Sequence, residues 1–192
     1  MRRTIFDTPV INHCFRLLSQ IGLKLFGWKL EGQRPDARKY VIIAAPHTSN
    51  WDFIFIIAFA FTFRIKVFWM GKNTLFKGPF GSVMRWLGGI PVDRNKANGL
   101  VQQVVDTFNS CTELAVAIPP EGTRSKVRQW KSGFYHVAHS AGVPIALSFL
   151  DFKKKVGGFG PMFSPTGDYE ADLIKIQDFY KDMTGKHPRK FA

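Results

Sequence analysis

The sequence predicts a single α/β domain in which one sheet is flanked by helices. Three observations lead to this prediction. Short apolar runs of strand length alternate with helical segments, and most of these runs end in polar or charged residues. The 192-residue chain is 45% hydrophobic and carries no repeat or low-complexity stretch. A chain of this length and composition can bury one substantial core, so we expect one folded domain.

The first predicted element is an amphipathic helix within residues 8–28. Its apolar positions recur at helical spacing: Val10, Ile11, Cys14, Leu17, Leu18, Ile21, Leu25 and Trp28. The opposite face carries His13, Arg16, Gln20 and Lys24. Such a helix fits a core-packing role and a membrane surface equally well, and near anionic headgroups each basic residue contributes about 1 kcal/mol. We expect residues 1–28 to form a membrane-associating helix and residues 29–192 to form the folded domain.

Strands and helices then alternate along the rest of the chain. Strands are expected over residues 40–45, 65–70, 90–92, 114–118 and 144–149, and helices over residues 50–63, 79–87, 96–110, 130–141 and 169–183. Ser49 or Asn50 suits the cap of the helix near residue 50, and Pro79 suits the start of the next helix. Ligands of open α/β sheets lie beyond the carboxyl ends of the strands. We therefore expect one site from the residues that follow four of these strands: His47, Lys72, Arg94, and Glu121 with Arg124.

The charge of the chain points to anionic partners. Its 27 Lys and Arg residues exceed its 14 Asp and Glu residues, which gives a net charge of +13. Aromatic residues make up 15% of the chain, and many lie in apolar runs rather than among the basic residues, as a base-stacking surface would require. A phosphorylated substrate or an anionic membrane surface is therefore expected, and nucleic acid is not.

Several common classes of protein are disfavoured. The longest uninterrupted apolar run, residues 53–61, is far shorter than the roughly 20 residues of a membrane-spanning helix, and no export signal is recognisable. Cys14 and Cys111 are isolated, which fits reduced thiols rather than a disulfide scaffold or a zinc site. His136 and His139 lack a third ligand at a suitable spacing, so we expect no bound metal.

A histidine and an aspartate at the end of the strand over residues 40–45 suggest proton transfer. His47 is followed five residues later by Asp52. With His47 in a loop and Asp52 in the first helical turn, the carboxylate could orient the imidazole as a general base. The chain has no Gly-x-Ser-x-Gly elbow and no cysteine in an activating context, so the expected nucleophile is a hydroxyl of the substrate. A glycine-rich phosphate loop is also missing, which favours acyl transfer over phosphoryl transfer.

Four blocks of the sequence resemble, in the same order, the motifs of the glycerolipid acyltransferase family, which includes bacterial 1-acylglycerol-3-phosphate acyltransferases. The blocks are His47 to Asp52, Gly88 to Arg94, Glu121 to Arg124, and Val143 to Ile145. The third is the most specific, because a Glu-Gly-Thr-Arg run at a strand end is improbable by chance at this distance from the first block. Many members have asparagine where Pro46 stands and phenylalanine where Pro91 or Pro119 stands.

The resemblance implies a role for each block. His47 would take the proton of the acceptor hydroxyl while Asp52 orients the imidazole, with no covalent intermediate. The acceptor phosphate would be bound by residues between and within the second and third blocks: Lys72, Arg94, Glu121, Gly122, Thr123 and Arg124. Since a carboxylate repels phosphate, we expect Glu121 to fix an arginine or a loop amide. The fourth block, Val143, Pro144 and Ile145, is expected on the side of the acyl donor.

The resemblance further implies an O-acyltransferase with a glycerol-3-phosphate acyltransferase-like fold. It would transfer a fatty acyl group from acyl-coenzyme A or acyl-acyl carrier protein to 1-acylglycerol-3-phosphate, giving phosphatidic acid without a bound cofactor. Its place would be the cytoplasmic face of a membrane, as a peripheral or monotopic protein that binds a lysophospholipid and an anionic surface. One alternative is another lysolipid acceptor, such as a lyso-aminolipid, and a second is a non-catalytic protein that binds lipid surfaces.

Overall fold

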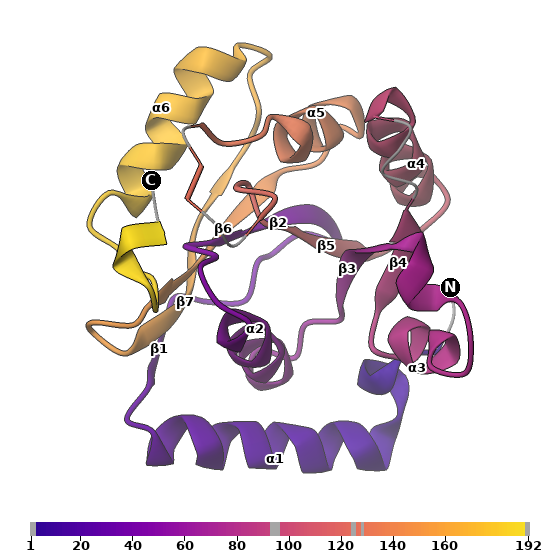
Figure 1. Cartoon of the computed structure of the whole chain (residues 1–192), viewed down its shortest axis with the longest axis vertical. Helices are drawn as coiled ribbons and strands as arrows, with labels where there is room; N and C mark the ends of the chain where they lie inside the picture. The colour runs from indigo at the N-terminus through magenta and orange to yellow at the C-terminus, as the bar shows by residue number, and fades with distance from the viewer. Residues whose placement is uncertain (1–2, 93–96, 124–125, 128, 191–192) are drawn as a thin grey trace.

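One mixed sheet forms the centre of the molecule and carries helices on both faces (Figure 1). The computed structural model describes residues 3–92, 97–123, 126–127 and 129–190. The strands are β1 (Lys29–Glu31), β2 (Lys39–Ala45), β3 (Val67–Lys72), β4 (Gly89–Val92), β5 (Leu114–Ile118), β6 (Ile145–Asp151) and β7 (Val156–Phe163). The α-helices are α1 (Pro9–Leu25), α2 (Trp51–Thr62), α3 (Gly81–Trp86), α4 (Ala97–Asn109), α5 (Gly133–Ser140) and α6 (Tyr169–Tyr180). Short 3₁₀ helices are η1 (Ile5–Asp7), η2 (Asn73–Phe76) and η3 (Pro188–Lys190).

The strand order places the expected site at one edge of the sheet. The order is β1-β7-β6-β2-β5-β3-β4, and neighbouring strands pair in parallel except for the antiparallel pair β6 and β7. Strands β2, β5, β3 and β4 are therefore adjacent and point the same way. The loops that follow these four strands all leave from the same edge, where α/β proteins place their ligands.

The two faces of β2 supply two separate parts of the core, as the period of a strand requires. Val41 and Ile43 pack with residues of α4, α5 and α6, including Phe108, Phe134 and Ile176. Tyr40 and Ile42 face the other way and pack with Ala60 of α2 and with Phe159 of β7. Both faces of this strand are buried, which is why it reads as a continuous apolar run in the sequence.

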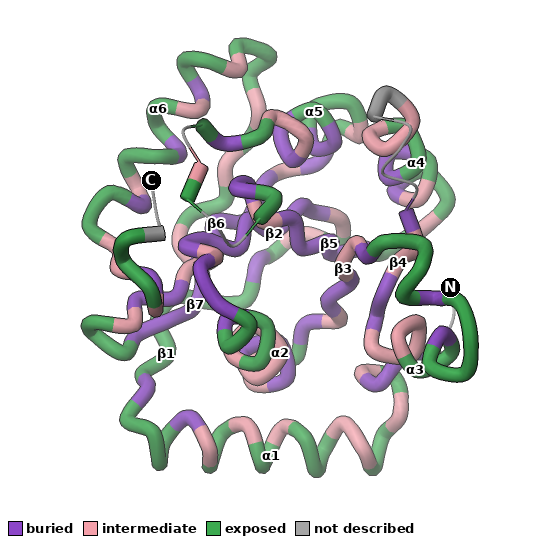
Figure 2. Tube along the Cα trace, viewed as in Figure 1, coloured by how far each residue is buried: buried purple, intermediate pink, exposed green. Residues whose placement is uncertain are grey.

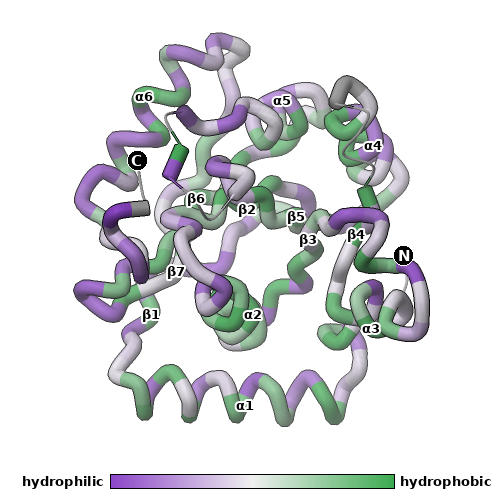
Figure 3. The backbone as a smooth tube through the Cα atoms, in the orientation of Figure 1, coloured by the Kyte–Doolittle hydropathy of each residue, from purple (hydrophilic) through white to green (hydrophobic). Residues whose placement is uncertain are grey.

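Helix α1 crosses the outside of α2 and leaves a long apolar face uncovered. Figure 2 shows exposed residues along the side of α1 that points away from α2, and Figure 3 shows hydrophobic and hydrophilic residues alternating along the helix. Phe15 stacks on Phe61 with ring centroids 5.4 Å apart, and Leu23 is buried. The exposed apolar side chains of the helix are Val10, Phe15, Leu17, Leu18, Ile21 and Leu25. Within the described residues, no helix is both long enough and apolar enough to cross a bilayer.

The predicted α/β fold with an N-terminal helix is confirmed, and the differences are local. Helix α5 begins at Gly133 rather than at residue 130, and α6 ends at Tyr180 rather than at residue 183. The sequence did not predict β1 or β7. β1 is only three residues long, and β7 contains glycines that favour turns in sequence reading but are required here by close packing. A Cβ built on Gly158 would lie 1.9 Å from the Glu31 carbonyl oxygen.

Candidate active site

The loop of residues 46–50 joins β2 to α2 and carries the predicted base. Pro46 follows the last residue of β2, and α2 begins at Trp51. The Ser49 hydroxyl oxygen accepts a hydrogen bond of 3.1 Å from the Trp51 N–H, which satisfies a backbone donor that the helix leaves unpaired. The chain therefore turns sharply out of the sheet, and His47 lies at the carboxyl edge.

Asp52 is a buried carboxylate that organises this loop. Its side chain has no solvent exposure, and its Oδ2 atom accepts hydrogen bonds from the backbone N–H groups of Thr48 and Ser49, both at 2.7 Å. Both bonds are short, and Asp52 stands in the first turn of α2, where an acidic side chain faces the positive end of the helix dipole. Among the described residues, the second oxygen, Oδ1, has no hydrogen-bonding partner.

His47 lies beside this carboxylate with part of its ring open to solvent. Its Nδ1 atom is 3.4 Å from Asp52 Oδ2, and its side chain is 19% exposed. The distance lies within ion-pair range, but the contact does not have hydrogen-bond geometry. The same Oδ2 atom accepts from the two amides of Thr48 and Ser49. Catalytic hydrogen bonds are often long until substrate binds. With Nδ1 turned toward Asp52, Nε2 is the nitrogen left to accept a proton from a substrate.

Glu121 fixes the backbone of His47 from the neighbouring strand end. It follows β5 in the turn that begins at Pro119, is only 1% exposed, and accepts a 3.0 Å hydrogen bond at Oε1 from the His47 N–H. Burial raises the pKa of this carboxyl, and the bond from His47 opposes that rise. The expectation that Glu121 holds a loop amide is therefore met by a direct contact. Glu121 and Asp52 therefore both accept hydrogen bonds from backbone N–H groups of the loop that carries His47.

The cationic part of the predicted site is only partly described. Lys72 is the exposed last residue of β3, next to Val92 of β4 in the sheet, so it lies at the same edge as His47. Gly122 and Thr123 are exposed beside the buried Glu121, and Gly122 adopts a positive φ of 63°. Arg94 and Arg124 lie outside the described residues.

Lys131 was missed by the sequence reasoning and lies against the third block. Its N–H donates to the Pro120 carbonyl oxygen at 2.8 Å. A Cβ built on Gly122 would be 2.8 Å from Lys131 Cδ and 3.2 Å from its Nζ, so the side chain lies directly over that glycine. Basic residues follow the third block in the sequence, so a cation near this turn could have been predicted. The sequence does not indicate which of these residues folds back onto the turn.

The fourth block lies at the opposite edge of the sheet. Ile145 is the first residue of β6 and pairs with Val41 near the start of β2, and the Pro144 carbonyl accepts from the Val41 N–H at 3.0 Å. Val143 and Ile145 are both buried in the core cluster that packs against α5. These residues support β2 from its amino end, whereas His47 follows its carboxyl end. Their assignment to the acyl-donor side stays a prediction.

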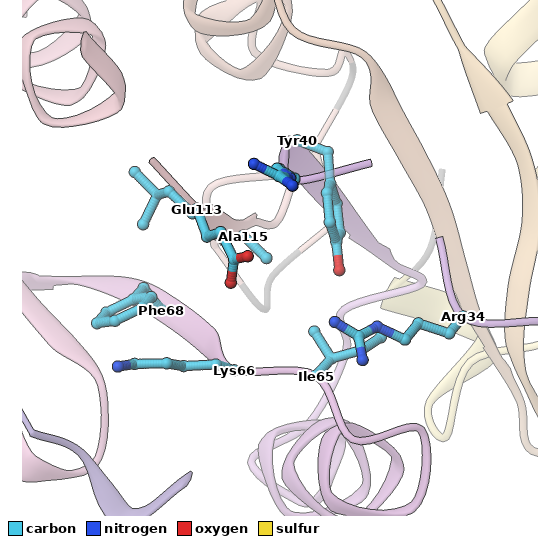
Figure 4. Close-up of a pocket in the computed structure, with 9 residues that line it drawn as sticks. Arg34, Tyr40, Ile65, Lys66, Phe68, Glu113 and Ala115 are labelled. Atoms are coloured by element: carbon cyan, nitrogen blue, oxygen red, sulfur yellow. The ribbon is translucent and has the colours of Figure 1, made fainter. Parts of the chain in front are cut away.

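A small pocket lies at this opposite edge as well, and it is not the predicted site. It has a volume of about 90 Å³ and is lined by residues that include Arg34, Arg38, Lys66 and Glu113 (Figure 4). It also touches Leu114 and Tyr40, which stand at the amino ends of β5 and β2. Burial raises the pKa of Tyr40 to about 12, and the Arg34 charge opposes this rise. The predicted catalytic residues, His47 and Asp52, lie beyond the other end of β2.

Fold and site together define a class of protein. It is an α/β protein with a partly exposed histidine at a sheet edge and a buried carboxylate beside the imidazole. One lysine ends the strand β3 at the same edge, and another lies over the turn after β5. Comparison with known families places the chain within this class. The model of the family described as Acyltransferase matches residues 28–146, which is more than half of the chain, and the chain belongs to that family.

Two curated relatives illustrate the similarity. The 1-acyl-sn-glycerol-3-phosphate acyltransferase of Escherichia coli (strain K12) is 37% identical over 131 residues, covering 63% of this chain and 52% of the relative. The protein of the same name from Haemophilus influenzae (strain ATCC 51907 / DSM 11121 / KW20 / Rd) is 33% identical over 131 residues, covering 63% and 53%. The chain therefore spans about half the length of the curated relatives it matches.

A solved structure has the same fold. The crystal structure of the 1-acyl-sn-glycerophosphate (LPA) acyltransferase PlsC from Thermotoga maritima superposes with a TM-score of 0.64, covering 89% of this chain and 77% of that chain. The two sequences are 20% identical, so this likeness shows the shared fold.

Proposed function

We propose that this protein is an O-acyltransferase that moves a fatty acyl group from an acyl thioester to the free hydroxyl of 1-acylglycerol-3-phosphate, giving phosphatidic acid. The observation that carries the proposal is the 3.4 Å contact between His47 Nδ1 and the fully buried Asp52, on a loop also held by Glu121. The names of its relatives, 1-acyl-sn-glycerol-3-phosphate acyltransferases, support the same acceptor.

In the proposed mechanism, His47 acts as the general base. Nε2 takes the proton of the acceptor hydroxyl as the hydroxyl oxygen attacks the thioester carbonyl carbon. Asp52 stabilises the imidazolium that forms. The tetrahedral intermediate then collapses, the carbon–sulfur bond breaks, and the imidazolium returns the proton to the departing thiolate. The protein contributes no nucleophile to these steps, and base catalysis of this kind is worth roughly 10²- to 10⁴-fold.

The acceptor phosphate is assigned to the cations around the sheet edge. Lys72 ends β3, and Lys131 lies over Gly122 of the third block, so both lysines stand at the edge that holds His47. Arg94 and Arg124 are proposed to complete this site, because the fork of a guanidinium suits two phosphate oxygens at once. The exposed residues Gly122 and Thr123 are assigned to the same phosphate site. Glu121 contributes indirectly, by fixing the His47 loop.

The protein is proposed to work at an anionic membrane surface. The uncovered apolar side chains of α1, with basic residues on the same helix, support residues 1–28 as the membrane-associating segment and residues 29–192 as the catalytic domain. The net charge of +13 fits anionic headgroups on the cytoplasmic face. The same charge would attract an acidic donor, either coenzyme A or acyl carrier protein, without a bound cofactor.

An acceptor panel tests the proposal. Purified protein is incubated with palmitoyl-coenzyme A and with lysolipids that carry or lack a phosphate monoester, and thiol release and lipid product are both measured. We expect phosphatidic acid from 1-acylglycerol-3-phosphate. Product from a lyso-aminolipid alone would show that 1-acylglycerol-3-phosphate is not the acceptor. It would also contradict the phosphate-binding roles proposed for the cations. A failure of every acceptor with both coenzyme A and carrier-protein donors would favour the alternative of a protein that binds lipid surfaces without catalysis.

A further inference from the structure

The segment of residues 184–187, which follows α6 in the chain, lies against the loop that carries the base. A Cβ built on Gly185 would be 2.9 Å from both Cγ2 and Oγ1 of Thr48 and 3.1 Å from Cβ of Pro46. The backbone N–H of His187 donates a 3.2 Å hydrogen bond to Thr48 Oγ1. Lys186 places its Nζ atom 4.4 Å from the ring centroid of Trp51, the first residue of α2. We call residues 184–187 the clamp segment.

The clamp segment is anchored on its other side, so it cannot simply move away from the loop. The Thr184 carbonyl accepts a 2.8 Å hydrogen bond from the Phe152 N–H, in the turn between β6 and β7. Before it, α6 is fixed by Tyr180, which is 1% exposed and donates to the Ser148 carbonyl at 3.0 Å. The helix is also held by the buried Asp172, which accepts from the Tyr135 hydroxyl at 2.8 Å.

Thr48 connects the clamp segment to the catalytic pair. This residue is 1% exposed, its side chain meets Gly185 and His187, and its backbone N–H donates to Asp52 Oδ2 at 2.7 Å. That same oxygen is the one 3.4 Å from His47 Nδ1. A shift of Thr48 therefore moves the carboxylate that orients the imidazole. The side chain of Thr48 is short and buried, so it cannot rotate clear of an added methyl group as a long surface side chain would.

We propose that Gly185 is a positioning residue for catalysis: by lacking a side chain it lets the clamp segment seat on Thr48 and hold the His47–Asp52 pair in its working geometry. The proposal rests on the proposed acyltransferase function. Reacting groups misplaced by about 1 Å can lose about 10²-fold in rate, so a contact this tight is sufficient to matter. Gly185 contacts Thr48 and Pro46 but none of the reacting atoms, and it acts through them.

The test compares Gly185→Ala with Gly133→Ala. Gly133 opens α5, and a Cβ built there has nothing within 4 Å, which makes it a matched control. We expect Gly185→Ala to lower kcat by about 10- to 100-fold with KM for the lysophospholipid within about twofold. Its Tm should stay within about 4 °C of wild type. Gly133→Ala should keep wild-type kcat. The new methyl group would meet both Cγ2 and Oγ1 of Thr48. Thr48→Ser removes Cγ2 and leaves a hydroxyl that can rotate away from the methyl group, so the double variant should recover at least about fivefold over Gly185→Ala.

Each outcome decides the question. Wild-type kcat in Gly185→Ala, or equal loss in the two glycine variants, overturns the proposal. A lack of rescue by Thr48→Ser also overturns it. If Gly185→Ala does not fold, Thr48→Val replaces it, because valine keeps the shape and removes the oxygen that accepts from His187. Wild-type kcat in Thr48→Val then overturns the proposal. If the wild-type protein fails to acylate any acceptor, the function fails instead, and the clamp segment is judged by ¹⁵N spectra of His47, which Gly185→Ala must shift more than Gly133→Ala.

Discussion

Replacement of Asp52 by asparagine tests how much of the catalysis depends on the buried carboxylate. The substitution keeps the size of the side chain and removes its charge. At the observed separation of 3.4 Å, an effective dielectric of about 20 gives about 5 kcal/mol between the carboxylate and an imidazolium. His47 is partly exposed, and an amide oxygen retains some attraction, so we take about half of this value. At 1.36 kcal/mol per tenfold change, kcat should fall by about 10²-fold.

The same substitution should cost stability, which the assay must separate from catalysis. Hydrogen bonds to charged groups contribute about 1.5–3 kcal/mol and neutral ones about 0.5–1.5 kcal/mol, so the weakened bonds from Thr48 and Ser49 should cost about 2 kcal/mol. Thermal unfolding locates a temperature at which the variant is fully folded, and kcat is measured there. Asp106→Asn, at an exposed position on α4, is the control and should change neither quantity. A folded Asp52→Asn variant with kcat within threefold of wild type would refute the orienting role.

Three further predictions address the surroundings of this pair. Burial raises the pKa of Glu121 above its ordinary value of 4.5, so wild type should lose stability relative to Glu121→Gln as pH rises through the raised pKa. Thermal unfolding of both proteins is measured from pH about 4 to about 7. A difference in Tm that stays constant over this range would contradict the prediction. The double variant Leu18→Glu/Leu25→Glu changes side chains that are 63% and 80% exposed, and it should weaken binding to anionic vesicles by at least about tenfold at unchanged Tm. Vesicle flotation equal to that of wild type would exclude α1 as the membrane contact. Lys72→Ala and Lys131→Ala should each raise KM for 1-acylglycerol-3-phosphate by about tenfold with little change in kcat, so an effect on kcat alone would count against phosphate binding.

The elements nearest the site were the easiest to predict, for a physical reason. β2 and β5 are buried on both faces and appear as uninterrupted apolar runs, while α2 has Asn50 at its N-cap position and Asp52 in its first turn. Local sequence is enough to fix such elements. The first and third blocks could be related to each other only through the resemblance and the strand-edge argument. The bond from the His47 N–H to Glu121, across 74 positions of sequence, is the contact that joins them.

The features that sequence could not predict are those created by contacts between distant segments. β7 pairs with β1 through glycines whose sequence signal is that of a turn. Lys131 reaches the third block only because its backbone is bonded to Pro120. No local sequence pattern indicates a role for Gly185, because the side chain that it contacts, that of Thr48, is 137 positions away. Periodicity and spacing report the neighbours along a helix or strand, and none of these contacts is of that kind.

One measurement tests the central claim that His47 is the base for acyl transfer to a lipid hydroxyl. Wild-type protein and His47→Ala are incubated with palmitoyl-coenzyme A and 1-acylglycerol-3-phosphate at a temperature where both are folded, and thiol and phosphatidic acid are counted together. Wild type should release one thiol for each phosphatidic acid, and His47→Ala should be slower by at least about 10²-fold. Equal rates in the two proteins, or thiol release by wild type without phosphatidic acid, would contradict the mechanism proposed for this site.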